Sequence, residues 1–121
     1  MNNLKLPHDH GEQEKEEHLK EQLSKPATFE AAADIFKLLD DTSRLRIFWL
    51  LCHCEECVIN ISALVGMTSP AVSHHLRQLK AKGLIVSRRD GKEVYYKAAD
   101  TDAGRLLHQT IEKIMAISCP E

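Results

Sequence analysis

The spacing of hydrophobic positions in the first half of the chain predicts two consecutive helices. After Thr28, which is suited to cap a helix, apolar residues recur every three or four positions, the period of one helical face. They are Phe29, Ala32, Ala33, Ile35, Phe36 and Leu39. The polar run 40–42 then ends this helix and caps the next. The second helix is apolar on almost every side and is therefore expected to be buried, through Leu45, Phe48, Trp49, Leu51 and Cys52.

Two shorter helices are predicted next, separated by a turn. Residues 58–65 form an apolar helix that Gly66 ends, because glycine readily adopts the left-handed conformation found after helices. Ser69 is expected to be the N-cap of the second helix, with Pro70 at its first helical position. Gly83 ends this helix. Its inward face is formed by Ala71, Val72, Leu76 and Leu79.

A strand pair and a last helix complete the pattern. In "LIVSRRDGKEVYYKAA", which starts at Leu84, two runs of β-branched and aromatic residues flank Asp90–Gly91, a pair that suits a tight hairpin turn. Asp100 or Thr101 then caps a helix with one apolar side, formed by Leu106, Leu107, Ile111, Ile114 and Met115. The predicted fold class is mostly α with a β-hairpin (α+β).

The N-terminal segment differs from the rest of the chain. Residues 1–26 contain histidines and an excess of acidic residues, and we expect a flexible arm that is helical only around 12–23, with Pro26 as a break. Residues 27–121 are predicted to form one domain, because 121 residues leave no room for a second core. Small domains bury a lower fraction of their surface, so a homodimer is expected.

The location of the protein follows from two features of composition. No apolar run approaches the ~20 residues that cross a bilayer, and the first residues do not resemble a signal peptide. We therefore expect a cytoplasmic protein with no membrane partner. Its four cysteines, Cys52, Cys54, Cys57 and Cys119, are poor disulfide candidates in a reducing compartment. Three of them lie close together, which indicates metal or redox chemistry.

The charge distribution points to nucleic acid although the net charge is −2. DNA-binding domains are usually basic, so the net charge alone argues against DNA. Between residues 70 and 97, however, seven basic residues stand against two acidic ones, whereas before Phe29 six acidic residues stand against four basic ones. Such an asymmetry between two parts of a chain is itself a signal of binding to phosphate.

The basic segment also has the order of elements of a helix-turn-helix, in which a short helix and a glycine-containing turn precede a helix with a polar outer face. Its residues are of the kind that reach base edges and phosphates in a major groove. We expect DNA contacts from Ser69, Ser73, His74, Arg77, Gln78 and Lys80. The hairpin would press on the backbone or minor groove through Arg88, Arg89 and Lys92.

Enzymatic function is not expected. A Cys/His pair can support nucleophilic catalysis, but so short a chain lacks the cleft, the oxyanion donors and the glycine-rich loops of an enzyme. A zinc-stapled interaction module is the other non-regulatory option, and it would keep its function after alanine replaces Arg77 or Arg88.

The segment "SPAVSHHLRQLKAKGLIVSRRDGKEVYYK" resembles the winged helix-turn-helix core of the ArsR/SmtB metal-responsive repressors, and "LLDDTSRLRIFWLL" resembles their entry helix. The resemblance covers about residues 29–117. It implies a homodimer, packed through its first and last helices, that binds an inverted repeat in a promoter. It also implies that a metal ion weakens DNA binding and releases transcription.

The same resemblance suggests where metal binds. "CHCEECV" resembles a family site in which a cysteine of the Glu-x-Cys-Val type, here Cys57, joins ligands from the partner's N-terminal arm. Cys54 and Cys57 supply two soft ligands, which suit Zn²⁺, Cd²⁺ or Pb²⁺. This arm has no cysteine but has His8 and His10, which would complete a tetrahedral set, and a further His18. Cys52 continues an apolar helix, where a cysteine is most often a small hydrophobe.

A second family site lies on the last helix and matches less well. Asp100 and Asp102 resemble its first pair of ligands, with aspartate in place of histidine. Its partner positions fall at Lys113 and Ala116, which do not bind metal. His108 and Glu112, four residues apart, form either a rearranged site or an ordinary surface pair.

Two other effectors remain open. Some family members respond to persulfides or oxidants through two cysteines, and Cys119 resembles the one in the last helix, with Cys57 or Cys52 as its partner. An arsenite sensor would use Cys52, Cys54 and Cys57 as three thiolates, since As(III) needs no histidine.

Overall fold

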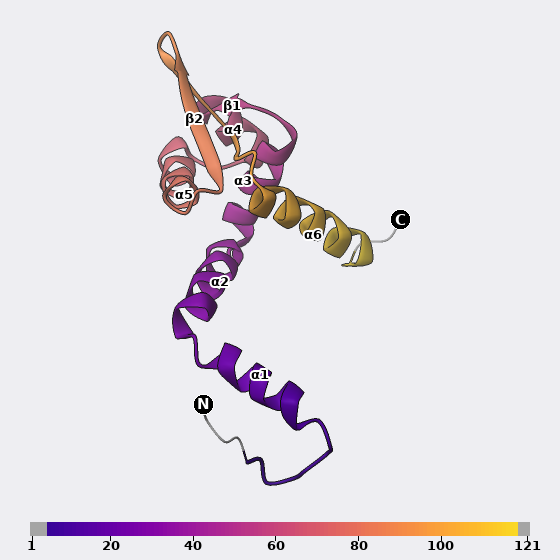
Figure 1. Cartoon of the computed structure of the whole chain (residues 1–121). Helices are drawn as coiled ribbons and strands as arrows, with labels where there is room; N and C mark the ends of the chain where they lie inside the picture. The colour runs from indigo at the N-terminus through magenta and orange to yellow at the C-terminus, as the bar shows by residue number, and fades with distance from the viewer. Residues whose placement is uncertain (1–4, 119–121) are drawn as a thin grey trace. The chain divides into compact units, whose positions relative to one another are not determined.

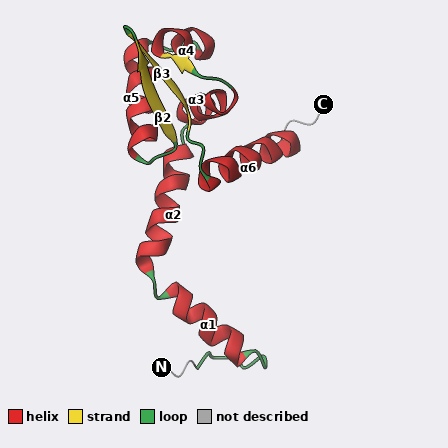
Figure 2. Ribbon diagram, turned by 45° about the horizontal axis from the view of Figure 1, so that its top comes forward, coloured by secondary structure: helices red, strands yellow, loops and turns green. Residues whose placement is uncertain are grey.

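The computed structural model describes the backbone of residues 5–118 and the side chains of residues 5–116. The chain is mostly helical, with one small antiparallel sheet, and Figures 1 and 2 show the course of its elements. They are α1 (Gln13–Leu23), α2 (Pro26–Leu39), α3 (Thr42–His53), β1 (Glu56–Cys57), α4 (Val58–Val65), α5 (Ser69–Ala81), β2 (Ile85–Asp90), β3 (Glu93–Ala98) and α6 (Asp102–Ser118). The predicted fold class is confirmed.

The chain divides into two compact units between Phe36 and Lys37. In the first, α1 has no buried residue and matches the helix expected around 12–23. The expectation that Thr28 caps the helix that contains Phe29 is wrong. α2 begins at Pro26, because proline, which lacks an N–H and has a helical φ, is well suited to a first turn. This division into compact units lies ten residues after the predicted boundary between the arm (1–26) and the domain (27–121). The predicted domain boundary stays a prediction.

The second unit contains the core, built where three helices meet the sheet. Ile47 and Phe48 of α3, Ile61 of α4 and Leu79 of α5 have no exposed surface. Each such side chain contributes about 1.5–3 kcal/mol by leaving water. Among the described residues no polar or charged residue is buried, so the core is held by apolar contacts. Figure 2 shows α5 beside β2, in agreement with the contacts between these elements.

The helix caps show why α3 and α6 begin where they do. The Asp41 carboxylate accepts a hydrogen bond from the Arg44 N–H at 2.9 Å, and this bond holds the pKa of Asp41 below its ordinary value. At α6, the Thr101 hydroxyl oxygen accepts from the Gly104 N–H at 3.1 Å. Of the two caps expected from the sequence for the last helix, Thr101 is therefore the one used.

The sheet has the order β1-β3-β2, and its first strand was not expected. Glu56 pairs with Tyr96 and Cys57 with Tyr95, so the cysteine-rich turn becomes part of the sheet. The hairpin turn is shifted by one residue from the prediction, because Asp90 pairs with Glu93 and belongs to β2. The turn is therefore Gly91–Lys92, with Gly91 at a φ of +64° that disfavours other residues.

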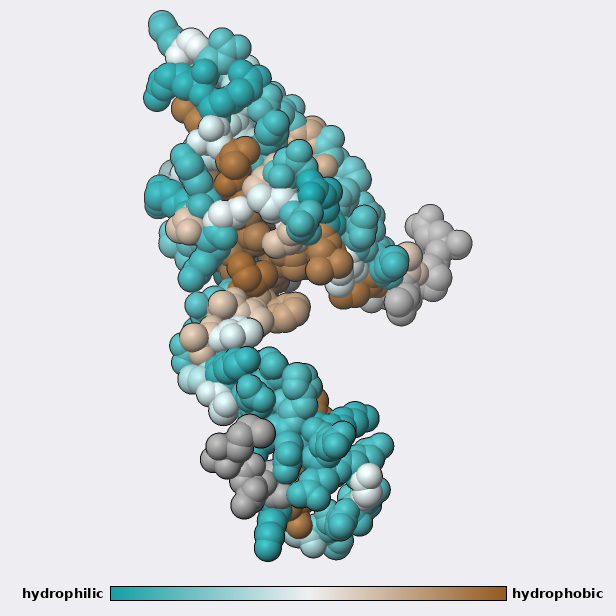
Figure 3. Space-filling model, viewed as in Figure 1, coloured by the Kyte–Doolittle hydropathy of each residue, from teal (hydrophilic) through white to brown (hydrophobic). Residues whose placement is uncertain are grey.

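One side of α6 leaves apolar residues exposed. Ile111 is buried against the core, whereas Leu106, Ile114 and Met115 are exposed. In Figure 3 the hydrophobic colour gathers along the underside of this helix. A largely apolar cavity of about 550 Å³ adjoins it, lined by residues of α3, α4 and α6 that include Trp49, Leu64 and Met115. Within the described part of the chain, no helix has the length and apolar character needed to cross a membrane.

Candidate DNA interface and metal-binding groups

The start of α5 is fixed by its cap and by the turn before it. α4 ends at Gly66, which adopts the left-handed conformation with a φ of +70°. The N-cap of α5 is Thr68, whose hydroxyl oxygen accepts from the Ala71 N–H at 3.4 Å. The expectation that Ser69 is the cap is therefore wrong by one residue. The Ser69 hydroxyl instead lies 3.2 Å from that of Ser62 and joins the two helices of the helix-turn-helix.

The two faces of α5 separate as its pattern predicts. Val72, Leu76 and Leu79 are buried, with exposed fractions of at most 1%. On the outer side His74, Arg77 and Lys80 are exposed, and Ser73 is half-buried. Arg77 has no hydrogen bond or ion pair to any residue that the structure describes, so its charge is available to a ligand.

Gln78, a predicted DNA contact, has a partner inside the protein. Its amide oxygen accepts a hydrogen bond of 2.7 Å from Arg44, whose side chain is only 13% exposed. Arg44 also donates to the Leu38 carbonyl and lies 3.5 Å from His75. This arginine thus links the end of α2, the start of α3 and the middle of α5. The hydrophobic pattern did not predict this contact, although Arg44 is one of two arginines in an otherwise largely apolar helix, where a charged side chain indicates a buried polar contact.

Arg88 of the hairpin is also paired. It donates to both carboxylate oxygens of Glu55, with distances of 2.7–3.0 Å, and lies 4.9 Å from the centre of the Tyr95 ring. This bidentate bond lowers the pKa of the Glu55 carboxyl. Lys80 donates to the Ser87 hydroxyl at 2.6 Å and so connects α5 with β2. Arg89 and Lys92 are exposed near the tip.

The three described cysteines lie in three different settings. Cys52 is half-buried in α3, and burial, together with the charge of Glu112, raises its thiol pKa to about 11. Cys54 follows the end of α3, donates to the Leu50 carbonyl at 3.4 Å, and has a thiol pKa raised mainly by burial. Cys57 is buried in β1. Cys119 lies outside the described residues.

Within the described residues, neither Cys54 nor Cys57 belongs to a group of three ligands drawn together. Thiols suit a soft ion, so further ligands from elsewhere are needed to complete a site here. Of the predicted arm ligands, His8 and His10 are exposed, with ring centroids 6.1 Å apart, and His18 is exposed on α1. The proposed ligand set of Cys54, Cys57, His8 and His10 stays a prediction.

The two aspartates before and at the start of α6 are occupied by a neighbour. Asp100 and Asp102 both form ion pairs with Arg105. A metal ion at this pair would have to displace the arginine. Their role as ligands also stays a prediction.

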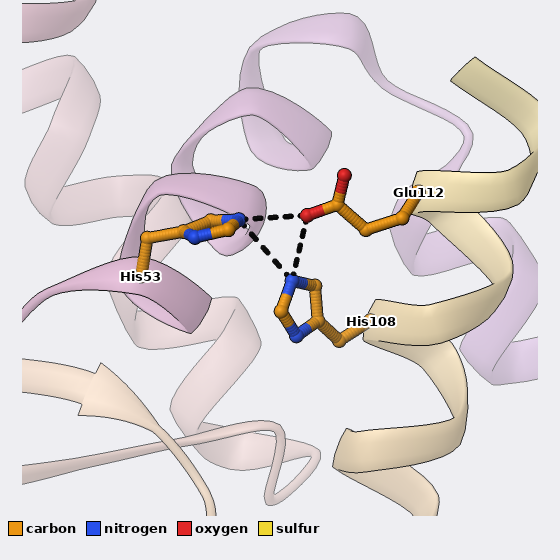
Figure 4. A group of neighbouring side chains, drawn as sticks. All are labelled: His53, His108 and Glu112. Carbon is orange, nitrogen blue, oxygen red and sulfur yellow. Dashed lines mark hydrogen bonds and ion pairs between the residues drawn. The ribbon is translucent and has the colours of Figure 1, made fainter. Parts of the chain in front are cut away.

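His108 of the same helix is instead drawn into a cluster of three metal-binding side chains, which Figure 4 shows. His53 from the end of α3 and Glu112 complete it. Glu112 Oε1 lies 2.8 Å from His53 Nε2 and 2.9 Å from His108 Nε2, and the two nitrogens are 3.2 Å apart. Hydrogen bonds from both rings lower the pKa of Glu112. The sequence indicated the pair on α6 but not His53.

Comparison with known proteins shows the family to which this chain belongs. Residues 41–87 match the model of the bacterial regulatory proteins of the arsR family. Over 80% of its length the chain resembles the homodimeric winged helix-turn-helix DNA-binding domain Mb0332 of Mycobacterium bovis, with 33% identity and a TM-score of 0.67, covering 88% of that domain. The chain therefore belongs to the ArsR family of transcriptional regulators and is not an enzyme.

Two curated proteins are also similar to this chain. The transcriptional repressor SmtB homolog of Synechocystis is 37% identical over 82 residues, 68% of this chain. The cadmium resistance transcriptional regulatory protein CadC of Listeria innocua is 41% identical over 76 residues, 60% of this chain. The matches span 62% and 64% of the length of those two proteins.

Proposed function

We propose that this protein is a metal-responsive transcriptional repressor that binds an inverted repeat in promoter DNA as a homodimer and is released by Zn²⁺ or Cd²⁺. The observation that carries the proposal is the outer face of α5, where His74, Arg77 and Lys80 are exposed above a fully apolar inner face. Side chains of this kind on a helix-turn-helix reach base edges and phosphates.

The charges of the hairpin support an auxiliary role in DNA binding. Arg89 and Lys92 are exposed and suit phosphate, whereas Arg88 is held by Glu55. In this arrangement Glu55 both orients Arg88 and places a negative charge near the DNA. Arg77 is therefore expected to contribute more to affinity than Arg88.

The homodimer is supported by the apolar residues that one protomer leaves exposed. A second copy of the chain would cover the exposed side chains of Leu106, Ile114 and Met115 on α6. It would also cover Phe29 and Phe36 of α2. A two-fold dimer presents two copies of α5, so its site would be an inverted repeat with half-sites ~34–36 Å apart.

Metal release is supported by the names of the relatives and by the thiols of the turn after α3. We propose Cys54 and Cys57, with His8 and His10 of the partner's arm, as the ligands of the inducing ion. A bound ion would favour the dimer shape in which the two α5 helices are wrongly spaced for DNA, provided that it binds that shape more tightly.

DNA binding is tested by fluorescence anisotropy with a labelled duplex from the protein's own promoter and the full-length, reduced protein. Arg77→Ala should weaken binding and make the slope of log K against log salt shallower by about 1, as expected for one lost phosphate contact. Lys25→Ala removes an equal charge outside the basic segment 70–97 and is the matched control. Equal affinities for the two variants would contradict the assignment of α5 as the DNA-reading helix.

Glu55→Gln gives a test of opposite sign. Arg88 loses its ionic partner and a negative charge disappears, so affinity at low salt should rise. Unchanged binding would place the hairpin away from the DNA, and weaker binding would mean that the orientation of Arg88 by Glu55 outweighs the negative charge that Glu55 brings.

The metal response is tested by adding Zn²⁺ or Cd²⁺, one equivalent per protomer, to the same complex. Release that is lost in both Cys54→Ser and Cys57→Ser supports the thiol site. Release by arsenite alone would favour the three-thiolate alternative at Cys52, Cys54 and Cys57. Release by persulfide or oxidant alone would favour a redox switch through Cys57 and Cys119. Burial of Cys57 and the raised pKa of Cys52 argue against a readily oxidised thiol.

A further inference from the structure

The cluster of His53, His108 and Glu112 joins two helices that are distant in the sequence. His53 occupies the last position of α3, and His108 and Glu112 lie one turn apart on α6, on the side that faces it. In Figure 4 all three side chains point toward one another. Neither the DNA-binding face nor the thiol group of the proposed function uses them.

The three ligand atoms form a nearly equilateral triangle with sides of 2.8, 2.9 and 3.2 Å. A tetrahedral ion with bonds of ~2.0–2.1 Å to nitrogen and oxygen holds its ligands about 3.4 Å apart. The triangle therefore needs to open by only a few tenths of an ångström to accept an ion above its centre. Partly exposed side chains that converge from two helices can make such an adjustment by small rotations.

The chemistry of the three groups fits one class of ion. Two imidazoles and a carboxylate are the ligands of Zn²⁺ sites that keep an open position, and imidazole also suits Co²⁺ and Ni²⁺. The side chains of His53, His108 and Glu112 are 44%, 29% and 42% exposed, so an ion has a path from solvent and a water molecule can complete its coordination.

An ordinary surface salt bridge explains the geometry of this cluster less completely than a metal site does. A carboxylate can accept hydrogen bonds from both imidazoles, so a salt bridge accounts for the two contacts of Glu112 but not for the approach of one ring nitrogen to the other. Here a second ring nitrogen approaches both the same oxygen and the first ring. A divalent ion accounts for all three contacts, because it binds the lone pairs of both imidazoles and of the carboxylate at one point.

We propose that His53, His108 and Glu112 bind one divalent ion of the Zn²⁺ class within a single protomer, separately from the thiol group at Cys54 and Cys57. The ion ties the end of α3 to the middle of α6. This site does not depend on the proposed function, since it requires neither DNA nor the partner's arm.

The protein contains a built-in reporter for this site. Trp49 is its single tryptophan, and the Trp49 ring lies 4.5 Å from the His53 ring, centre to centre. Co²⁺ bound to His53 should quench the fluorescence of Trp49, and its visible absorption reports the ligand type. The experiment titrates the full-length, reduced protein with Co²⁺ and then displaces the Co²⁺ with Zn²⁺.

Two variants remove ligands without removing core residues. His108→Gln and Glu112→Gln should each weaken Co²⁺ quenching at least tenfold in apparent affinity. His74→Gln, which removes an exposed histidine from α5 outside the cluster, is the matched control for Co²⁺ binding and should be quenched by Co²⁺ as the unmodified protein is. Cys54→Ser should retain quenching and give a Co²⁺ spectrum without thiolate charge-transfer bands.

Three outcomes would overturn the proposal: no saturable quenching, equal quenching in His108→Gln and His74→Gln, or loss of quenching in Cys54→Ser. The first two mean that the cluster is a hydrogen-bonded surface group only, and the third assigns the ion to the thiols. DNA binding measured on His108→Gln and Glu112→Gln keeps the two proposals separate, because failure of this site leaves the anisotropy results unchanged.

Discussion

Replacing Gly104 by alanine provides a sharp test of how α6 is joined to the rest of the protein. Alanine within a helix is normally more favourable than glycine by about 1 kcal/mol, so helix propensity alone predicts a more stable protein. The structure predicts the opposite sign. Gly104 lies in the first turn of α6, and a Cβ built on it would be 2.6 Å from the Ala99 carbonyl oxygen and 3.2 Å from the Thr101 hydroxyl oxygen.

The size of the expected loss of stability depends on which atoms must move to make room for the new Cβ. The Ala99 carbonyl belongs to the backbone of a buried residue whose N–H donates to the Leu84 carbonyl at 2.9 Å, so it cannot rotate away. Overpacking of this kind costs about 1–3 kcal/mol. The shift also loosens the Thr101 cap, which is worth ~1 kcal/mol. After subtracting the propensity gain, we expect Gly104→Ala to destabilise the protein by about 1–3 kcal/mol.

The assay is urea unfolding followed by circular dichroism at one fixed protomer concentration, because dimer formation makes apparent stability depend on concentration. With a slope of ~1–3 kcal/mol per molar urea, a loss of 2 kcal/mol lowers the midpoint by about 1 M. Ala103→Gly, at the neighbouring exposed position, is the control and should show only the propensity cost. A midpoint for Gly104→Ala at or above that of the unmodified protein would refute the close approach of Ala99 to α6.

Two further predictions concern single titratable groups. The pKa of Asp41 is lowered in the folded protein, so its charged form contributes stability that is complete above the ordinary value of 3.8 and is lost as pH falls through the folded pKa. Asp41→Asn, which keeps the cap, should remove this part of the acid dependence in unfolding measurements, whereas Asp41→Ala should cost about 0.5–2 kcal/mol at neutral pH. Cys52, with a pKa of about 11, should react with iodoacetamide at pH 8 about a hundredfold more slowly in the native protein than in urea. Mass spectrometry of the alkylated peptide measures both rates, and similar rates would contradict the burial of Cys52.

The parts of the fold that sequence could predict are those with local causes. Gly66 and Gly91 lie in turns where a positive φ is required, and both turns were placed within one residue. The inner face of α5 follows from helical spacing, and all three of its largest predicted residues are buried. The errors at Thr28 and Ser69 are shifts of helix starts by three residues and by one residue. At the first, the helix already begins at Pro26, and at the second, the neighbouring Thr68 hydroxyl takes the cap.

What sequence could not predict depends on residues that only the fold brings together. β1 has two residues, too few for an alternation pattern, and exists because it pairs with β3 about 40 residues later. The Arg44–Gln78 bond joins two helices across 34 positions, and His53 meets His108 across 55. His53 was visible in "CHCEEC" but its neighbours there are cysteines, so the pattern pointed to a thiol site. The contacts of His53 are set by the direction of α3, which turns the His53 side chain toward α6.

The segment 53–57 therefore connects several parts of the second unit. His53 reaches α6 through Glu112, and Glu55 holds Arg88 of the hairpin. Cys57 pairs with Tyr95 in the sheet. An ion at His53 and an ion at Cys57 would act on different neighbours, the first on α6 and the second on the sheet that carries the hairpin. Because both ligands lie within five consecutive residues, binding at either group constrains the backbone of the other, and the two affinities are expected to be linked equally in both directions.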